Sequence, residues 1–217
     1  MTRSRAARLA GSALLAAAAA VLLVLWARQT AALRALERAA SAPVGSDAAL
    51  AEFDRSVALG SGDPLTRALR SGALLARGDF EGADADARAA AVSYDSPPFA
   101  LQRASITRRL GRDAESVSLL ERARLMDPDS VETLTQLAAT LYALGRYEEA
   151  SRVATEFVER HPDNVDALYL QGACAEALGR PAQARVCYLQ VQDLLERGAK
   201  SALKIAADDA DDRLRSD

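Results

Sequence analysis

The chain has 217 residues, of which 50% are apolar and only 5% aromatic, and its formal net charge is -3 at pH 7. This length fits one ordinary domain with attachments, and the composition suits closely packed helices built from alanine and leucine. Because no cluster of lysine and arginine is available to hold phosphates, we expect no nucleic-acid partner.

The first 27 residues predict a membrane anchor. Residues 1–8 form a basic tail, and residues 9–27 contain no charged side chain. At about 1.5 Å per residue this run spans roughly 28 Å as a helix, close to the thickness of a bilayer's hydrocarbon core. A cleaved secretory signal is the alternative. Cleavage after Ala27 would put the bulky Leu25 at a position that requires a small residue, and the apolar run is long for a signal. Both observations favour an uncleaved transmembrane helix.

The charges that flank this run predict its orientation. Arg3, Arg5 and Arg8 favour a cytoplasmic start. Three arginines on the other side, Arg28, Arg34 and Arg38, weaken the asymmetry. Lysine is scarce and alanine abundant, which we interpret as the bias of a GC-rich bacterial genome. We therefore expect a single-pass protein of a bacterial inner membrane with a periplasmic soluble domain. A domain facing the cytoplasm is the alternative.

Two further segments precede the main domain. Residues 28–46 predict a juxtamembrane helix and a linker, because Pro43 and Gly45 break helices. Residues 47–63 predict a helix with Leu50, Phe53 and Val57 on one face. We interpret this helix as the second half of a degenerate repeat.

A fixed interval organises the rest of the chain. Glycines recur 33, 34 and 34 residues apart, each where a helix turn is expected, at Gly78, Gly111, Gly145 and Gly179. In the clearest copy, residues 131–164, four apolar residues follow the i, i+3, i+4, i+7 spacing of one helix face. A second such stripe follows the glycine and ends at Pro162. These stripes are Leu134, Leu137, Ala138 and Leu141, then Tyr147, Ala150, Ala154 and Phe157.

This spacing closely resembles the tetratricopeptide repeat, a 34-residue helix-turn-helix family. The resemblance implies an all-α superhelical solenoid over residues 64–198, with a capping helix and tail in residues 199–217. Its four units are residues 64–96, 97–130, 131–164 and 165–198. Asp95 stands where the first unit's closing proline belongs, and Arg103 and Thr107 interrupt the second unit's apolar stripe, so we expect looser packing there.

No constellation of catalytic or metal-binding residues is visible. The single histidine, His161, precedes a proline in a predicted turn, and Cys174 and Cys187 have no further zinc ligands nearby. Phosphate-loop and nucleophile-elbow motifs are missing. We therefore expect neither enzymatic activity nor a cofactor, and an enzyme with an unfamiliar site is a remote alternative. The two cysteines suit an alanine-rich core, and a disulfide between them is the alternative.

The resemblance implies that a protein or peptide ligand lies on the concave face, along the first helix of each unit. The set lacks the lysine and asparagine of a carboxylate clamp. We expect the tyrosines to supply contact area and the arginines to select an acidic group, although the tyrosines would also suit packing between units. The candidate residues are Leu101, Arg108, Arg109, Thr135, Tyr142, Tyr169 and Glu176.

Taken together, these features predict a membrane-anchored protein-interaction module, serving as an extracytoplasmic scaffold or assembly factor for a bacterial envelope complex. A membrane adaptor that recruits soluble proteins from the cytoplasm is the alternative.

Overall fold

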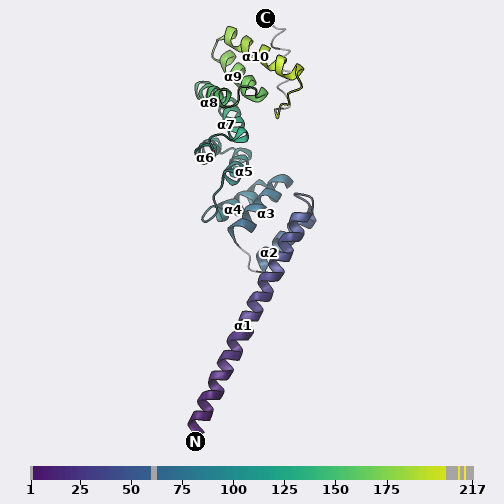
Figure 1. Ribbon diagram of the computed structural model, residues 1–217, viewed down its shortest axis with the longest axis vertical. Coiled ribbons are helices and arrows are strands. Elements are labelled where there is room, and N and C mark those ends of the chain that lie inside the picture. Colours follow the sequence, from purple (N-terminus) through teal and green to yellow (C-terminus); the bar gives the residue numbers. More distant parts are fainter. Residues whose placement is uncertain (1, 60–62, 204–209, 211–212, 214–217) are drawn as a thin grey trace. The chain divides into compact units, whose positions relative to one another are not determined.

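The computed structural model describes residues 2–59, 63–203, 210 and 213, with side chains from residue 20 onward, and divides into two compact units. The first unit is Met1–Asp95 and the second is Ser96–Asp217. Regular structure in the described part is entirely α-helical (Figure 1). This confirms the predicted all-α class.

The first unit consists of two helical hairpins. In the first hairpin, small side chains of α1 bury against α2, and the Ser56 hydroxyl donates a 3.0 Å hydrogen bond to the Ala32 carbonyl. Helix α1 is continuous, so the expected juxtamembrane helix is its last part and not a separate element. The helices are α1 (Thr2–Ser41), α2 (Asp47–Ala58), α3 (Pro64–Arg77) and α4 (Phe80–Ala90).

The predicted membrane span, residues 9–27, lies within α1. The side chains of residues 9–19 are outside the described set. Among the residues that were described, no helix has the length and apolarity needed to cross a bilayer.

The second hairpin, α3 and α4, has a core of alanines joined by buried charges. Asp86 on α4 is only 3% exposed. Arg70 Nη2 donates to Asp86 Oδ1 at 2.7 Å, and Arg67 Nη1 lies 3.4 Å from the same oxygen. Arg70 also contacts Asp54 on α2 at 2.8 Å. These arginines compensate the burial of the carboxylate, which an alanine core alone does not do.

The second unit contains three consecutive hairpins, α5/α6, α7/α8 and α9/α10. Their turns are the same: Gly111, Gly145 and Gly179 each adopt a φ of 71°, a left-handed conformation that suits glycine. The N–H that follows each glycine bonds a carbonyl five residues earlier, as Arg146 does with Leu141 at 3.0 Å. The helices are α5 (Pro97–Arg109), α6 (Asp113–Met126), α7 (Val131–Ala143), α8 (Tyr147–Arg160), α9 (Val165–Ala177) and α10 (Pro181–Glu196).

The predicted apolar stripes form the core of this unit. Leu134, Leu137 and Leu141 are at most 2% exposed, as is Phe157 on the facing helix. Thr107 is also buried, because its hydroxyl donates to the carbonyls of Arg103 and Ala104 on its own helix. The polar interruption expected to loosen the second unit is thus satisfied locally.

The C-terminal segment differs from the prediction. The expected capping helix does not begin at residue 199, since residues 199–203 are not helical, whereas Ala210 and Arg213 are. The other residues of this expected helix and tail, 204–209, 211–212 and 214–217, lie outside the described residues. The cause is Asp166 in the first turn of α9. Its carboxylate accepts hydrogen bonds from the Ala202 and Leu203 N–H groups at 2.9 and 3.2 Å and from the Ser201 hydroxyl.

Candidate functional site

The predicted concave residues of α7 and α9 come together at one side of the second unit. Tyr142 and Tyr169 are half-buried and pack against the main core cluster. Glu176 lies in the last turn of α9 and interacts electrostatically with Tyr142. The structure therefore groups three of the seven sequence-predicted residues.

Two residues that the repeat register did not select complete this group. The Tyr188 hydroxyl on α10 donates to Glu176 Oε2 at 3.0 Å, and its ring centroid lies 6.1 Å from that of Tyr169. Arg213 pairs with Glu176, and its guanidinium lies 5.9 Å from the centre of the Tyr188 ring. We call Tyr142, Tyr169, Glu176, Tyr188 and Arg213 the tyrosine cluster.

Burial determines the titration of this cluster. It raises the pKa of Tyr142, which the positive charge of Arg213 partly opposes. Burial and the hydrogen bond to Glu176 both raise the pKa of Tyr188. Both phenols therefore stay neutral at physiological pH and act as hydrogen-bonding aromatic surfaces.

The other predicted residues lie apart from the cluster. Leu101 is buried in the core, and Arg108 and Arg109 are exposed at the end of α5, outside the contacts described for the tyrosine cluster. Thr135 is 9% exposed, and its hydroxyl has no hydrogen-bond partner among the described residues. The arginines expected to select an acidic group therefore stand apart from the contacts that define the tyrosine cluster.

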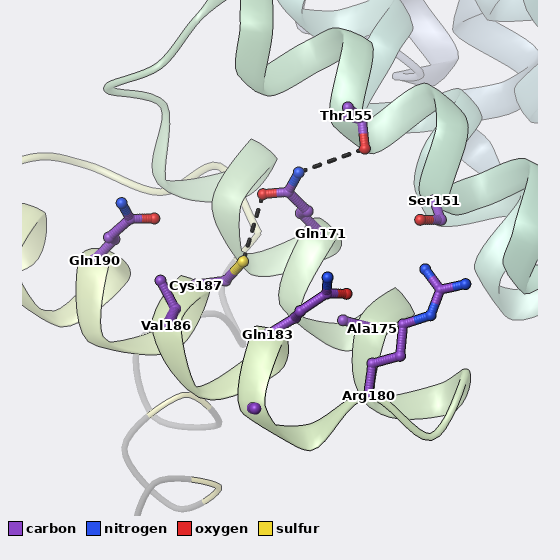
Figure 2. A pocket seen from close by; sticks show the side chains of 10 residues that line it. Ser151, Thr155, Gln171, Ala175, Arg180, Gln183, Val186, Cys187 and Gln190 are labelled. Carbon is purple, nitrogen blue, oxygen red and sulfur yellow. Dashed lines mark hydrogen bonds between the residues drawn. The ribbon is translucent and has the colours of Figure 1, made fainter.

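A cleft lies on the other side of α9, between α8 and α10, and sequence reasoning did not find it (Figure 2). Its volume is about 520 Å³. Gln171 lies between its walls, donating to the Thr155 hydroxyl at 3.4 Å and accepting from the Cys187 thiol at 3.4 Å. We call it the outer cleft; it is lined by Ser151, Thr155, Gln171, Ala175, Arg180, Ala182, Gln183, Val186, Cys187 and Gln190.

A smaller cleft of about 300 Å³ occupies the equivalent position one unit earlier, between α6 and α8. Its walls carry ion pairs: Arg124 contacts Glu121 and Glu156, each at 2.8 Å. The sequence signal that separates the two clefts is the replacement of these charges by neutral residues 34 positions later, at Thr155 and Gln190.

The residues that carry chemistry in other proteins have structural roles here. His161 Nε2 lies 3.0 Å from the Asp129 carbonyl in the turn between units, and its ring meets Phe157 edge-on. Cys174 and Cys187 are both free and buried. In the described ranges, no group of three or more histidine, cysteine, aspartate or glutamate side chains is placed to hold a metal ion.

Consecutive hairpins with repeated glycine turns define the fold as an α-helical repeat solenoid. Residues 135–194 match the family model described as "Tetratricopeptide repeat", which supports the resemblance for the last two units. No curated protein sequence matches the chain significantly.

Solved structures share the fold at low sequence identity. The chain resembles YrrB, described as "a TPR protein with an unusual peptide-binding site", with a TM-score of 0.64, 17% identity and coverage of 76% of this chain and 82% of that one. A crystal structure of MamA gives a TM-score of 0.70 at 14% identity, covering 80% and 96%. MamA 41-end from Desulfovibrio magneticus RS-1 gives 0.67 at 13%, covering 82% and 98%.

Proposed function

We propose that this chain is a protein-interaction module that binds a peptide segment of a partner at the tyrosine cluster. One observation carries the proposal: this side of α9 already holds a non-helical segment of its own chain. Asp166 bonds the backbone of residues 202 and 203, and Leu203 packs against both apolar clusters of the unit. Side chains that hold the backbone of a non-helical segment in this way are the kind of contact that peptide recognition requires.

The chemistry of the cluster suits such a role. Tyrosines offer large contact areas at a small cost in side-chain entropy, and their hydroxyls fix orientation. The Thr135 hydroxyl, buried without a described partner, is a further group that a ligand would satisfy. YrrB, a protein of the same fold, is described as having a peptide-binding site.

We further propose that residues 9–27 anchor the chain in a bacterial inner membrane, with the repeats outside the cytoplasm as a scaffold or assembly factor. The charge-free run and the basic tail before it support this arrangement. The nearly balanced arginines on both sides keep a cytoplasm-facing adaptor as the second candidate.

The binding proposal is tested by changing both Tyr142 and Tyr169 to alanine. Removing two aromatic anchors costs roughly 2 kcal/mol or more, so capture of the partner from native membranes falls about 30-fold. Leu189→Ala is the control, because Leu189 is exposed on α10 and is not part of the tyrosine cluster. Undiminished capture by the double variant, with helicity preserved by circular dichroism, contradicts the assignment.

The topology is tested separately with a reporter enzyme that is active only outside the cytoplasm, fused after Asp217. We expect activity in intact cells. An inactive reporter, with the fusion present at full length in the membrane fraction, supports the cytoplasm-facing adaptor.

A further inference from the structure

The outer cleft contains an arginine that has lost the partner its counterparts keep. In the two preceding units the arginine after the turn glycine pairs with a glutamate three residues later. Arg112 contacts Glu115 at 3.2 Å, and Arg146 contacts Glu149 at 2.7 Å. In the last unit the glutamate is replaced by Gln183, and Arg180 forms no ion pair with any described residue.

Two further substitutions open the space beside this arginine. The core residues Leu137 and Leu141 of α7 correspond, 34 positions later, to Gln171 and Ala175 of α9. Leu141 lines the smaller cleft of about 300 Å³, whereas Gln171 and Ala175 line the outer cleft of about 520 Å³. The last unit thus has an amide and a methyl group where the preceding unit has two leucine side chains, and its cleft is the larger of the two.

The cleft presents hydrogen-bonding groups suited to one kind of ligand. Three glutamine amides line it, and each offers donors and an acceptor that match the backbone amides of an extended chain. The guanidinium of Arg180, which pairs with no carboxylate in the described part of the chain, adds a fixed positive charge with the fork geometry that binds carboxylates. Val186, 56% exposed where the smaller cleft has Arg152, adds an apolar contact. Figure 2 shows Arg180 and Gln183 extending toward the same space from the start of α10.

We propose that the outer cleft binds the carboxylate of an extended peptide, with Arg180 as its ionic partner and the glutamines as partners of the adjoining peptide backbone. A volume of about 520 Å³ lies within the range of pockets that hold small ligands, which fits a few residues and not a folded surface. The carboxylate belongs to either the peptide's C-terminus or an acidic side chain.

This site goes beyond the tyrosine cluster and is independent of it. At about 100° per residue, Gln171 and Ala175 project from α9 between about 100° and about 160° away from Tyr169 and Glu176. The two surfaces therefore lie on different faces of one helix.

The test uses the purified full-length chain and three fluorescein-labelled probes, measured by fluorescence anisotropy. The probes are Ala-Ala-Ala-Ala with a free carboxylate, the same peptide as a C-terminal amide, and Ala-Glu-Ala-Ala as an amide. We expect the free acid to bind roughly tenfold or more tightly than the plain amide, the usual strength of a hydrogen bond to a charged group. If the glutamate peptide binds as tightly as the free acid, the site accepts either kind of carboxylate, and if it fails to bind, the site is assigned to C-termini.

The decisive variant is Gln183→Glu, which restores the ion pair of the preceding units and therefore keeps the fold. It reduces binding of the free acid to the level of the amide, as Arg180→Gln also does, whereas Arg180→Lys retains part of the affinity. Arg146→Gln, one unit earlier, is the matched control and leaves binding unchanged. Equal binding of the acid and the plain amide, no binding of any probe, or full binding by Gln183→Glu overturns the proposal. A loss caused instead by the Tyr142 and Tyr169 double variant assigns the probes to the tyrosine cluster and also overturns it.

Discussion

Cys174 and Cys187 show how a side chain's surroundings decide its chemistry. They lie on neighbouring helices, α9 and α10, and both are free thiols. Cys174 is fully buried in the apolar core, where burial raises the pKa of its thiol to about 11. Cys187 borders the outer cleft, and burial raises its pKa as well. Both thiols remain protonated and unreactive at neutral pH.

The Cys174 thiol makes the stability of the fold depend on pH in the alkaline range. In the unfolded chain it ionises near its ordinary pKa of 9.0, whereas in the folded chain it holds its proton until about pH 11. Its contribution is therefore complete below pH 9 and is lost as the pH rises toward 11. We expect Cys174→Ala to show a smaller fall in the free energy of unfolding between about pH 8 and about pH 10.5, measured by urea titration. Equal falls in the two proteins contradict this account.

Individual hairpins are stabilised by different means. In α7/α8 large apolar side chains fill the space between the helices, but α3/α4 has mainly alanine and serine there. In α3/α4 the ion pairs of the buried Asp86 carboxylate with Arg67 and Arg70 hold the two helices together.

Asp86→Ala removes this link and leaves the guanidinium of Arg70 without its buried partner. We expect a loss of about 3 kcal/mol in the free energy of unfolding of the hairpin. Asp54→Ala is the matched control, since it removes the other carboxylate of the same arginine. Asp54 is 69% exposed, so its loss costs about 1 kcal/mol or less. The free energies of unfolding are measured by thermal and denaturant unfolding. If the two variants lose equal amounts, the burial of Asp86 does not add to the stability of the hairpin.

The hairpins were predictable because apolar stripes and turn glycines are local signals. The grouping of Tyr142, Tyr169 and Glu176 followed from the repeat register. Tyr188 was missed because it lies on the second helix of its unit, which the register excludes from the concave face. The outer cleft was missed for another reason: it depends on replacements relative to the preceding unit, where Leu141 stands in place of Ala175 and the cleft walls carry ion pairs.

At the scale of the whole molecule, the last described residues are part of the fold and not an appendage. Ala210 is 2% exposed within the apolar cluster of α9 and α10, and Arg213 pairs with Glu176. Residues 201–203, Ala210 and Arg213 thereby lie against the side of α9 where we place the peptide site. A partner has to bind beside this segment or replace it.

Asp166→Ala tests how the segment is held. The change leaves the N–H groups of residues 202 and 203 without their acceptor, so we expect trypsin to cleave after Lys200 severalfold faster. Asp163→Ala is the control, because Asp163 is an exposed carboxylate in the turn before α9. The cleavage rate is followed by mass spectrometry of the intact chain. An unchanged rate means that apolar packing alone keeps the segment in place.

The continuity of α1 sets a distance. Ala32, whose carbonyl accepts a hydrogen bond from Ser56 on α2, lies five residues beyond Ala27, which is about 8 Å of helix. With residues 9–27 in a bilayer, as we propose, a short, rigid helical segment and not a flexible linker would join the first hairpin to the membrane. The hairpin would then lie close enough to the bilayer for headgroup charge and membrane curvature to act on it directly. Only partners that can approach the lipid surface closely would reach it.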